Sequence, residues 1–269
     1  MEEASADKMT DHDAIGLFAH RLADQAAEVS SSYFRGGLEI DLKGDDSPVT
    51  LADRQIEREV REALAKAYPD HAILGEEYGA GDLTNDHVWV VDPIDGTRSF
   101  ISGQPLYGFL LAHMEKGRSV FGMISMPELN ERYIGQVGRG AVLNGVPIST
   151  SGQTVMSEAI VYINEGDKLL EFESEIISRL LRLGHTTRFS YDCYPHALLA
   201  AGHIDLVVDY DLKPFDFLPL KAVIEEAGGV ISDWAGEPLG YRSSGRVVSA
   251  ATPALHEQAI DMLSGRGGL

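Results

Sequence analysis

The sequence predicts a layered fold, part α+β and part α/β, in which helices and sheets stack in the order α, β, α, β, α. Residues 13–68 carry two amphipathic helical patterns, residues 71–148 carry short β-rich runs, and residues 159–264 alternate strands with helices. With 269 residues, of which 44% are apolar, the chain is long enough to bury a full core.

The first half is predicted to begin with two helices. Residues 1–12 are polar and acidic and are expected to form a disordered lead-in. The helix over 13–34 ends before a glycine pair, and the helix over 50–68 ends at Pro69. The apolar positions of the first helix are Ile15, Leu17, Phe18, Leu22, Ala26 and Val29. The predicted buried stripe of the second is Leu51, Ile56, Val60 and Leu64.

Strands and a hairpin follow. The period changes after Pro69 to short β-rich runs, at 71–75, 87–91, 106–114, 119–126 and 131–137. Residues 135–148 read as hairpin material, because Asn144-Gly145 is a strong tight-turn signal.

The second half is predicted to alternate strands and helices. The strands are expected at 159–163, 204–208, 228–232 and 246–250, and the helices at 168–183, 195–202, 216–227 and 253–264. We expect one compact catalytic unit, with an N-terminal α+β half at 13–152 that holds a metal site and a C-terminal α/β half at 153–269 that completes it.

Charge and composition narrow the function. The chain carries 22 Lys+Arg against 42 Asp+Glu, a net charge of −20, which disfavours nucleic acid as a partner. One cysteine excludes an internal disulfide and CxxC sites. No apolar run approaches ~18 residues, so no membrane span is predicted. The acidic N-terminus is unlike a secretory signal, and a cytoplasmic location is expected.

The most informative segment is VWVVDPIDGTRSF at 88–100. An apolar strand runs directly into Asp92 and Asp95, and carboxylates three residues apart can face one point. Hard cations such as Mg²⁺ prefer such oxygen ligands. Gly96 and Thr97 then begin a helix, whose first N–H groups favour a phosphate. The pattern indicates a metal-assisted phosphate site.

Helix capping is the alternative interpretation of each acidic residue. Asp95, Asp53 and Asp216 all stand where a helix begins, and each is a reasonable cap by itself. Glu76, however, follows another apolar strand, and four carboxylates at the ends of elements favour a site over independent caps.

Other catalytic patterns are weak or missing. A haloacid-dehalogenase-type nucleophile would require an Asp two residues before Asp95, where Pro93 stands. Nine histidines show no HxH or HExxH spacing, and no GxSxG or GxxxxGK[ST] motif occurs. Cys193 is interpreted as a small buried residue rather than a nucleophile. Water activated by a metal is then the expected nucleophile.

The combination of GEE at 75–77, DPIDGT at 92–97, PFD at 214–216 and EEAGGVISDWAG at 225–236 resembles the inositol monophosphatase superfamily. The resemblance extends over essentially the whole chain from residue 13, including Lys43 and the TLAD segment. It implies the layered αβαβα sandwich of that superfamily.

The resemblance also implies the metal ligands. Glu76, Asp92 and the carbonyl of Ile94 would hold one Mg²⁺, and Asp92, Asp95 and Asp216 would hold a second. A third, weaker ion would lie near Glu76, giving two to three ions per active site.

The same resemblance implies the catalytic and phosphate-binding residues. Gly96 and Thr97 would bind the phosphate, and Thr97 paired with Asp53 would orient the attacking water together with Glu76. One ion would lower the pKa of that water and the other would stabilise the leaving oxygen.

Within the superfamily, the chain is most similar to the histidinol-phosphatase branch. The stretches RFSYDCY and LKPFD carry this similarity. Two positions differ: Ser190-Tyr191 stands where the branch has a glycine pair, and Asp209 stands where the branch has a Glu. Arg188, Asp192, Asp209 and Lys43 are the implied substrate-binding residues. Asp192 and Asp209 suit a cationic leaving group. The alternative interpretation of Asp192 is a cap of the helix that follows it, and that of Arg188 is a surface ion pair.

The sequence therefore predicts a Mg²⁺-dependent phosphomonoesterase, a homodimer by resemblance, whose partner is a small-molecule phosphate monoester. Histidinol phosphate, hydrolysed to histidinol and phosphate, is the expected substrate. An inositol monophosphatase or a broad sugar- or nucleotide-phosphate phosphatase is the alternative. A non-catalytic interaction protein on the same fold is a more remote one.

Overall fold

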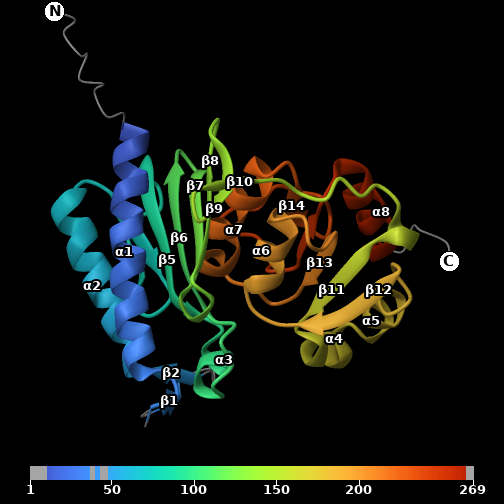
Figure 1. Ribbon diagram of the computed structural model, residues 1–269, viewed down its shortest axis with the longest axis horizontal. Coiled ribbons are helices and arrows are strands. Elements are labelled where there is room, and N and C mark those ends of the chain that lie inside the picture. The colour runs from blue at the N-terminus through green and yellow to red at the C-terminus, as the bar shows by residue number, and fades with distance from the viewer. Residues whose placement is uncertain (1–10, 37–39, 43–47, 265–269) are drawn as a thin grey trace, which may run out of the picture.

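The computed structural model describes residues 11–36, 40–42 and 48–264, and it has the predicted five-layer order (Figure 1). Helices α1 and α2 form one outer layer, an eight-stranded sheet the next, α6 and α7 the middle, a five-stranded sheet the fourth, and α4, α5 and α8 the last. The α+β layered-sandwich prediction is confirmed. Within the described ranges no helix is both long enough and apolar enough to cross a membrane.

Helices α1 (Asp11–Tyr33) and α2 (Leu51–Ala67) pack on the outer face of the large sheet. Helix α1 begins at Asp11, so residues 11 and 12 are helical rather than part of a disordered lead-in, and residues 1–10 lie outside the described part. Two predicted core positions are wrong: Leu17 is 54% exposed and Leu51 is 46% exposed. Thr50 forms the N-cap of α2 and, with Asp53, a capping box, so Leu51 stands at the solvent-facing first turn.

The large sheet has the strand order β10-β9-β8-β7-β6-β5-β3-β4, antiparallel except where β3 pairs with β5. Asn144 and Gly145 form the predicted tight turn, both with positive φ. The strands are β3 (Ala72–Gly75), β4 (Gly79–Ala80), β5 (His87–Asp95), β6 (Gly108–Glu115), β7 (Arg118–Met126), β8 (Glu131–Gln136), β9 (Gly140–Leu143) and β10 (Val146–Ile148). A separate hairpin pairs β1 (Ile40–Leu42) with β2 (Pro48–Thr50).

The small sheet has the order β12-β11-β13-β15-β14, with β11 parallel to both of its neighbours. Its strands are β11 (Ile160–Asn164), β12 (Thr186–Ser190), β13 (Leu206–Asp209), β14 (Val230–Asp233) and β15 (Val247–Ala250). Strand β12 was not predicted. The single helix expected over 168–183 is two helices, α4 (Gly166–Phe172) and α5 (Ser174–Leu180), because Glu173 leaves the helical region at φ −135°. Helix α8 (Pro253–Leu263) lies as predicted.

The middle layer joins the two sheets. Helices α6 (Tyr194–Ala200) and α7 (Pro214–Glu226) belong to the second half of the chain, yet α7 packs directly on strands β7 and β8 of the first. Gly122 and Gly135 face each other across those strands. A Cβ on Gly122 would lie 2.2 Å from the carbonyl oxygen of Pro219, and one on Gly135 2.2 Å from that of Ala222. The missing side chains let the helix backbone lie against the sheet.

This close approach gives a test. Gly122→Ala should lower the free energy of unfolding by about 2–3 kcal/mol, because the new methyl group meets backbone that cannot rotate away. Denaturant unfolding measures the change. Gly16→Ala is the matched control, since that glycine lies in α1 with nothing within 4 Å of a built Cβ, and it should raise stability by about 0.5–1 kcal/mol. An equally mild effect at Gly122 would contradict the packing argument.

Candidate active site

The acidic motif lies on a bulged strand. Strand β5 continues through Asp95, and its pairing with β6 skips one residue, since Asp92 pairs with Leu110 and Asp95 with Gly108. In a regular strand, residues three apart point to opposite faces of the sheet. The extra residue of a β-bulge restores a common direction, so Asp92 and Asp95 point to the same place. The structure thus has a bulge where the sequence suggested a turn.

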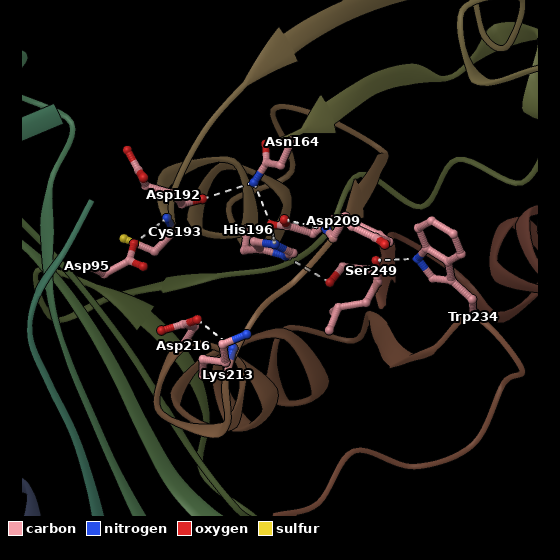
Figure 2. Close-up of polar contacts among 12 residues, drawn as sticks. Asp95, Asn164, Asp192, Cys193, His196, Asp209, Lys213, Asp216, Trp234 and Ser249 are labelled. Carbon is pink, nitrogen blue, oxygen red and sulfur yellow. Dashed lines mark hydrogen bonds and ion pairs between the residues drawn. The ribbon is translucent and has the colours of Figure 1, made fainter. Parts of the chain in front are cut away.

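Asp216, from the first turn of α7, joins these two carboxylates. Ligand oxygens of Asp92, Asp95 and Asp216 all lie within 4.8 Å of one another. Each carboxylate is held by a backbone N–H. Ile94 donates to Asp92 (3.1 Å), Cys193 to Asp95 (2.6 Å) and Lys213 to Asp216 (2.7 Å; Figure 2). The donors lie on β5 and at the N-caps of α6 and α7, so the large sheet and the middle helical layer together fix the cluster.

The cap interpretation of these residues is partly right. Asp216 forms a capping box at the start of α7 and also belongs to the cluster. Asp95 does not cap helix α3 (Thr97–Ile101), whose N-cap is Gly96, but accepts the N–H of Cys193 at the start of α6 instead. Capping and clustering are therefore compatible, since a carboxylate has two oxygens.

Burial and mutual repulsion raise the pKa of all three carboxyls. For Asp92 the causes are burial, then Glu76, Asp95 and Asp216, and its pKa rises well above the usual range. For Asp95 they are burial, then Asp192 and Asp216. Burial raises the pKa of Asp216 to about 6 against the opposing hydrogen bond from Lys213. Such an all-oxygen group with excess negative charge fits a hard divalent cation.

Glu76 approaches the cluster from the loop after β3 and lines the same cavity. The loop is held by Glu57, a fully buried residue of α2 whose carboxylate accepts the backbone N–H groups of Glu77 (2.6 Å) and Tyr78 (3.2 Å). Arg61 donates to the same carboxylate at 2.7 Å. Asp53, Glu76 and Glu77 form a second group of close acidic ligands. The sequence pattern does not single out Glu57, because its position in the helix is that of any other core-facing residue.

Thr97 lies between the cluster and Asp53. Its hydroxyl reaches Oδ1 of Asp53 at 3.4 Å and the carbonyl oxygen of Ile94 at 3.2 Å. Asp53 is fully buried and also accepts the N–H and hydroxyl of Thr50. Gly96 has φ +86°, and a Cβ there would lie 2.7 Å from the carboxylate of Asp192. Glycine therefore allows both the turn and the close approach of that side chain.

A cavity of about 180 Å³ opens over the cluster. It is bounded at one end by Glu76, Asp95 and Asp216 and is also lined by residues of the second half. Asp192, just before α6, has φ +61° and accepts the hydroxyl of Ser99 at 2.5 Å. Burial raises the pKa of Asp192 to about 6. Its side chain makes no cap contact with α6, whose N-cap is Cys193, so the cap alternative does not hold.

Asp209 also lines the cavity, but its oxygens are taken up by the protein (Figure 2). Oδ2 accepts Asn164 Nδ2 at 2.6 Å and lies 3.1 Å from His196 Nε2, and Oδ1 accepts the N–H of Tyr210 at 2.8 Å. His196 in turn contacts Ser249 at 2.9 Å. The side chains of Asp209, Asn164, His196 and Ser249 are all buried, so Asp209 braces the wall of the cavity.

The remaining predicted residues lie elsewhere. Arg188 is exposed on β12, an edge strand, and does not line the cavity, so its assignment as a substrate contact is not supported by its position. Lys43 lies outside the described residues. Cys193 is 2% exposed, and burial raises the pKa of its thiol, as expected for an unreactive core residue.

Two groupings had no local sequence signal. Glu165, Lys168 and Asp211 line the cavity from α4 and the loop after β13. His71, His87 and His113 stack with nearly parallel rings at the opposite end of β5, where strand register alone brings them together. Each group is brought together only by the long-range packing of the fold, so neither residue spacing nor composition could predict it.

Known proteins resemble the chain over nearly its whole length. A family model described as Inositol monophosphatase family matches residues 11–266. Bifunctional phosphatase IMPL2, chloroplastic, of Arabidopsis thaliana is 40% identical over 94% of this chain and 76% of its own length. A histidinol-phosphatase of Chlorobaculum parvum is 38% identical over 81% of this chain and 85% of its own.

The fold agrees with these matches. The structure of an inositol monophosphatase from Zymomonas mobilis superposes with a TM-score of 0.83 at 38% identity, covering 95% of this chain and 99% of that one. A single family model thus spans the chain that has the bulged acidic strand, the α7 carboxylate and the layered architecture. The chain therefore belongs to the inositol monophosphatase family, a family of metal-dependent phosphatases.

Proposed function

We propose that the protein is a Mg²⁺-dependent phosphomonoesterase that hydrolyses histidinol phosphate to histidinol and phosphate. The observation that carries the proposal is the geometry of one cavity. Two carboxylates of the close cluster, Asp95 and Asp216, line this cavity, and further carboxylates from the second half of the chain line it as well. The first suits metal ions and phosphate, and the second suits a leaving group with positive charge.

The donor set supports two or three Mg²⁺ ions. Asp92, Asp95 and Asp216 would hold one ion, and Glu76, Asp92 and the carbonyl oxygen of Ile94 another, with a third, weaker ion near Glu76. All of these ligands are oxygens, and the raised pKa values mark a site short of positive charge. When bound, the ions lower the pKa of a water molecule and neutralise the phosphoryl oxygens.

The neighbouring residues orient the reactants. Gly96 and Thr97 would bind the phosphate at the start of α3. The hydroxyl of Thr97, within reach of Asp53, would align the attacking water together with Glu76, and Asp53 is itself fixed by Thr50. These groups contribute mainly by positioning, since a water held in line with the phosphorus avoids the entropy of a chance encounter.

The wall of the cavity supports the choice of ester. Histidinol phosphate carries an ammonium group and an imidazole, and Asp192 stands beside Gly96 with one oxygen accepting Ser99. A neutral polyol gains less from such a carboxylate. The similarity to a histidinol-phosphatase at 38% identity favours the same ester. Inositol phosphate, suggested by the Zymomonas mobilis structure, and sugar or nucleotide phosphates are the rival substrates.

The chain is also proposed to form a homodimer. Among the described residues, five of the eleven large hydrophobic side chains that stay exposed lie on α4, on β12 and on the residues that directly follow α5 and β12: Leu170, Phe172, Leu181, Phe189 and Tyr191. An apolar surface of this kind suits a partner, and the particle mass in solution tests the assignment. The cytoplasmic location expected from the sequence stays a prediction.

Asp95→Asn tests the metal assignment. The variant keeps an acceptor for the N–H of Cys193 but removes one charge from the proposed ligand set, so it should fold and lose turnover. Phosphate release at saturating Mg²⁺ should give a kcat below about a tenth of the wild-type value. Activity above that level with normal Mg²⁺ dependence would sink the two-ion assignment. The absence of phosphate release by the wild type itself would favour the non-catalytic alternative.

The stability of the metal-free protein gives a second test. Because the pKa values of Asp192 and Asp216 are raised to about 6, these groups favour folding when protonated, and their stabilising effect is lost as pH rises from about 4 through 6. Asp92 and Asp95 extend the loss to higher pH. With chelator present, the melting temperature should therefore fall between pH 5 and 7.

Added Mg²⁺ should reverse that fall in a concentration-dependent way, because it binds the folded cluster. Asp95→Asn supplies the comparison, since it should flatten the pH dependence and reduce the Mg²⁺ effect. A melting temperature that is insensitive to both pH and Mg²⁺ would argue against the clustered site.

Asp192→Asn tests the substrate. A charge-assisted hydrogen bond contributes roughly 1.5–3 kcal/mol, so the ratio of kcat/KM for histidinol phosphate to that for glycerol 2-phosphate should fall by about ten- to a hundred-fold. An equal loss on both esters would make Asp192 a structural residue and remove the main physical support for histidinol phosphate. No change on either ester would favour the broad-specificity alternative.

A further inference from the structure

Besides Asp211 and Asp216, three carboxylates of the second half line the cavity, and they differ in how far the protein already uses them. Asp209 has partners on both oxygens and is 1% exposed. Asp192 is bound to the Ser99 hydroxyl and lies against Gly96, at the phosphate end of the cavity. The third carboxylate, Glu165, is the one most available to an incoming group.

Glu165 occupies an unusual backbone position at the start of α4. Its φ is +50°, a region that residues other than glycine rarely adopt. Such a conformation has a cost, and it is found most often where function requires it. The side chain is 16% exposed, and within the described part of the chain its carboxylate makes one ion pair, to the ammonium of Lys168 at 2.8 Å.

Lys168 itself lines the cavity and is shared between two carboxylates. Its ammonium lies 2.8 Å from Glu165 and 3.2 Å from Asp211, and Asp211 also pairs with Lys213 at 2.7 Å. The lysine shows that this part of the cavity wall holds a primary ammonium group. It also neutralises the charge that a cationic substrate would otherwise meet, so it competes for the same carboxylate.

We propose that Glu165 and Lys168 are a specificity pair. Glu165 is a second carboxylate, in addition to Asp192, and it receives the primary ammonium of the leaving group, while Lys168 is an internal competitor that limits this preference. The substrate class is phosphate monoesters of alcohols that carry a primary ammonium. The inference rests on the proposed phosphatase activity, but it does not depend on histidinol phosphate being the natural ester.

The Glu165–Lys168 pair is only partly shielded from water, since Lys168 is 29% exposed and Glu165 16% exposed. The cationic end of the leaving group is remote from the phosphorus, so interactions there are equal in the ground state and the transition state. Their loss should therefore appear in KM rather than in kcat.

The experiment compares phosphoethanolamine, a small ester with a primary ammonium, with glycerol 2-phosphate, which is neutral beyond its phosphate. The readout is the ratio of kcat/KM for the two esters in the Mg²⁺-loaded full-length chain. Glu165→Gln should lower the ratio about ten-fold, and Lys168→Met should raise it about three- to ten-fold, both through KM. The opposite signs are specific to a competing pair.

Three controls accompany these variants. Glu165→Asp and Lys168→Arg keep the charges and should return the ratio towards the wild-type value. Glu175→Gln removes a carboxylate that pairs with Arg179 on α5, outside the cavity, and should leave the ratio unchanged. Thermal unfolding of each variant checks that the fold is intact.

The outcomes separate this inference from the proposed function. If Glu165→Gln and Lys168→Met leave the ratio unchanged, or shift it in the same direction, the specificity pair is overturned, while the phosphatase assignment and the role of Asp192 stand. If the opposite shifts appear with phosphoethanolamine but the wild type does not prefer histidinol phosphate, the pair is supported and only the natural ester was wrong.

Discussion

The need to hold like charges close together shapes the whole molecule. Asp92, Asp95 and Asp216 lie within 4.8 Å of one another in a largely dry setting, where burial raises the pKa of all three and Asp216 further raises those of Asp92 and Asp95. Within the described part of the chain, the hydrogen bonds that anchor these carboxylates come from no lysine or arginine side chain. Backbone N–H groups from β5, α6 and α7 do so instead, and they fix the oxygens without supplying a full compensating charge. A site built this way stays electrostatically unsatisfied, which is the property that binds a dication.

The layered architecture makes that anchoring possible. Asp92 and Asp95 come from the large sheet, and Asp216 comes from a helix encoded more than a hundred residues later. Gly122 and Gly135 remove the side chains that would keep α7 away from the sheet. Two small residues far from the chemistry thus set the distance between carboxylates, in the same way that Glu57 sets the loop of Glu76.

Features with local causes were predictable from the sequence, and those that depend on register or long-range packing were not. The layer order, the Asn144-Gly145 turn and the acidic positions at the ends of elements follow from periodicity and turn chemistry. The bulge that aligns Asp92 with Asp95 depends on how β5 pairs with β6. Strand β12 forms by parallel pairing with β11 at the edge of the small sheet, and its sequence lacks a strong alternating pattern. Glu165 and Lys168 reach the cavity only after α4 has docked, so their spacing resembles an ordinary helical ion pair.

Because the carboxylate of Asp95 is anchored by the N–H of Cys193, the site is complete only after the later part of the chain has been synthesised. A ribosome releases Glu76, Asp92 and Asp95 long before it releases Cys193 and Asp216. During that interval a nascent chain displays three of the four acidic ligands, without Asp216 and without the N–H group that orients Asp95. Hydrolysis therefore cannot begin on a partly translated chain, and cellular phosphate esters meet this protein only after the C-terminal layers have closed over the first sheet.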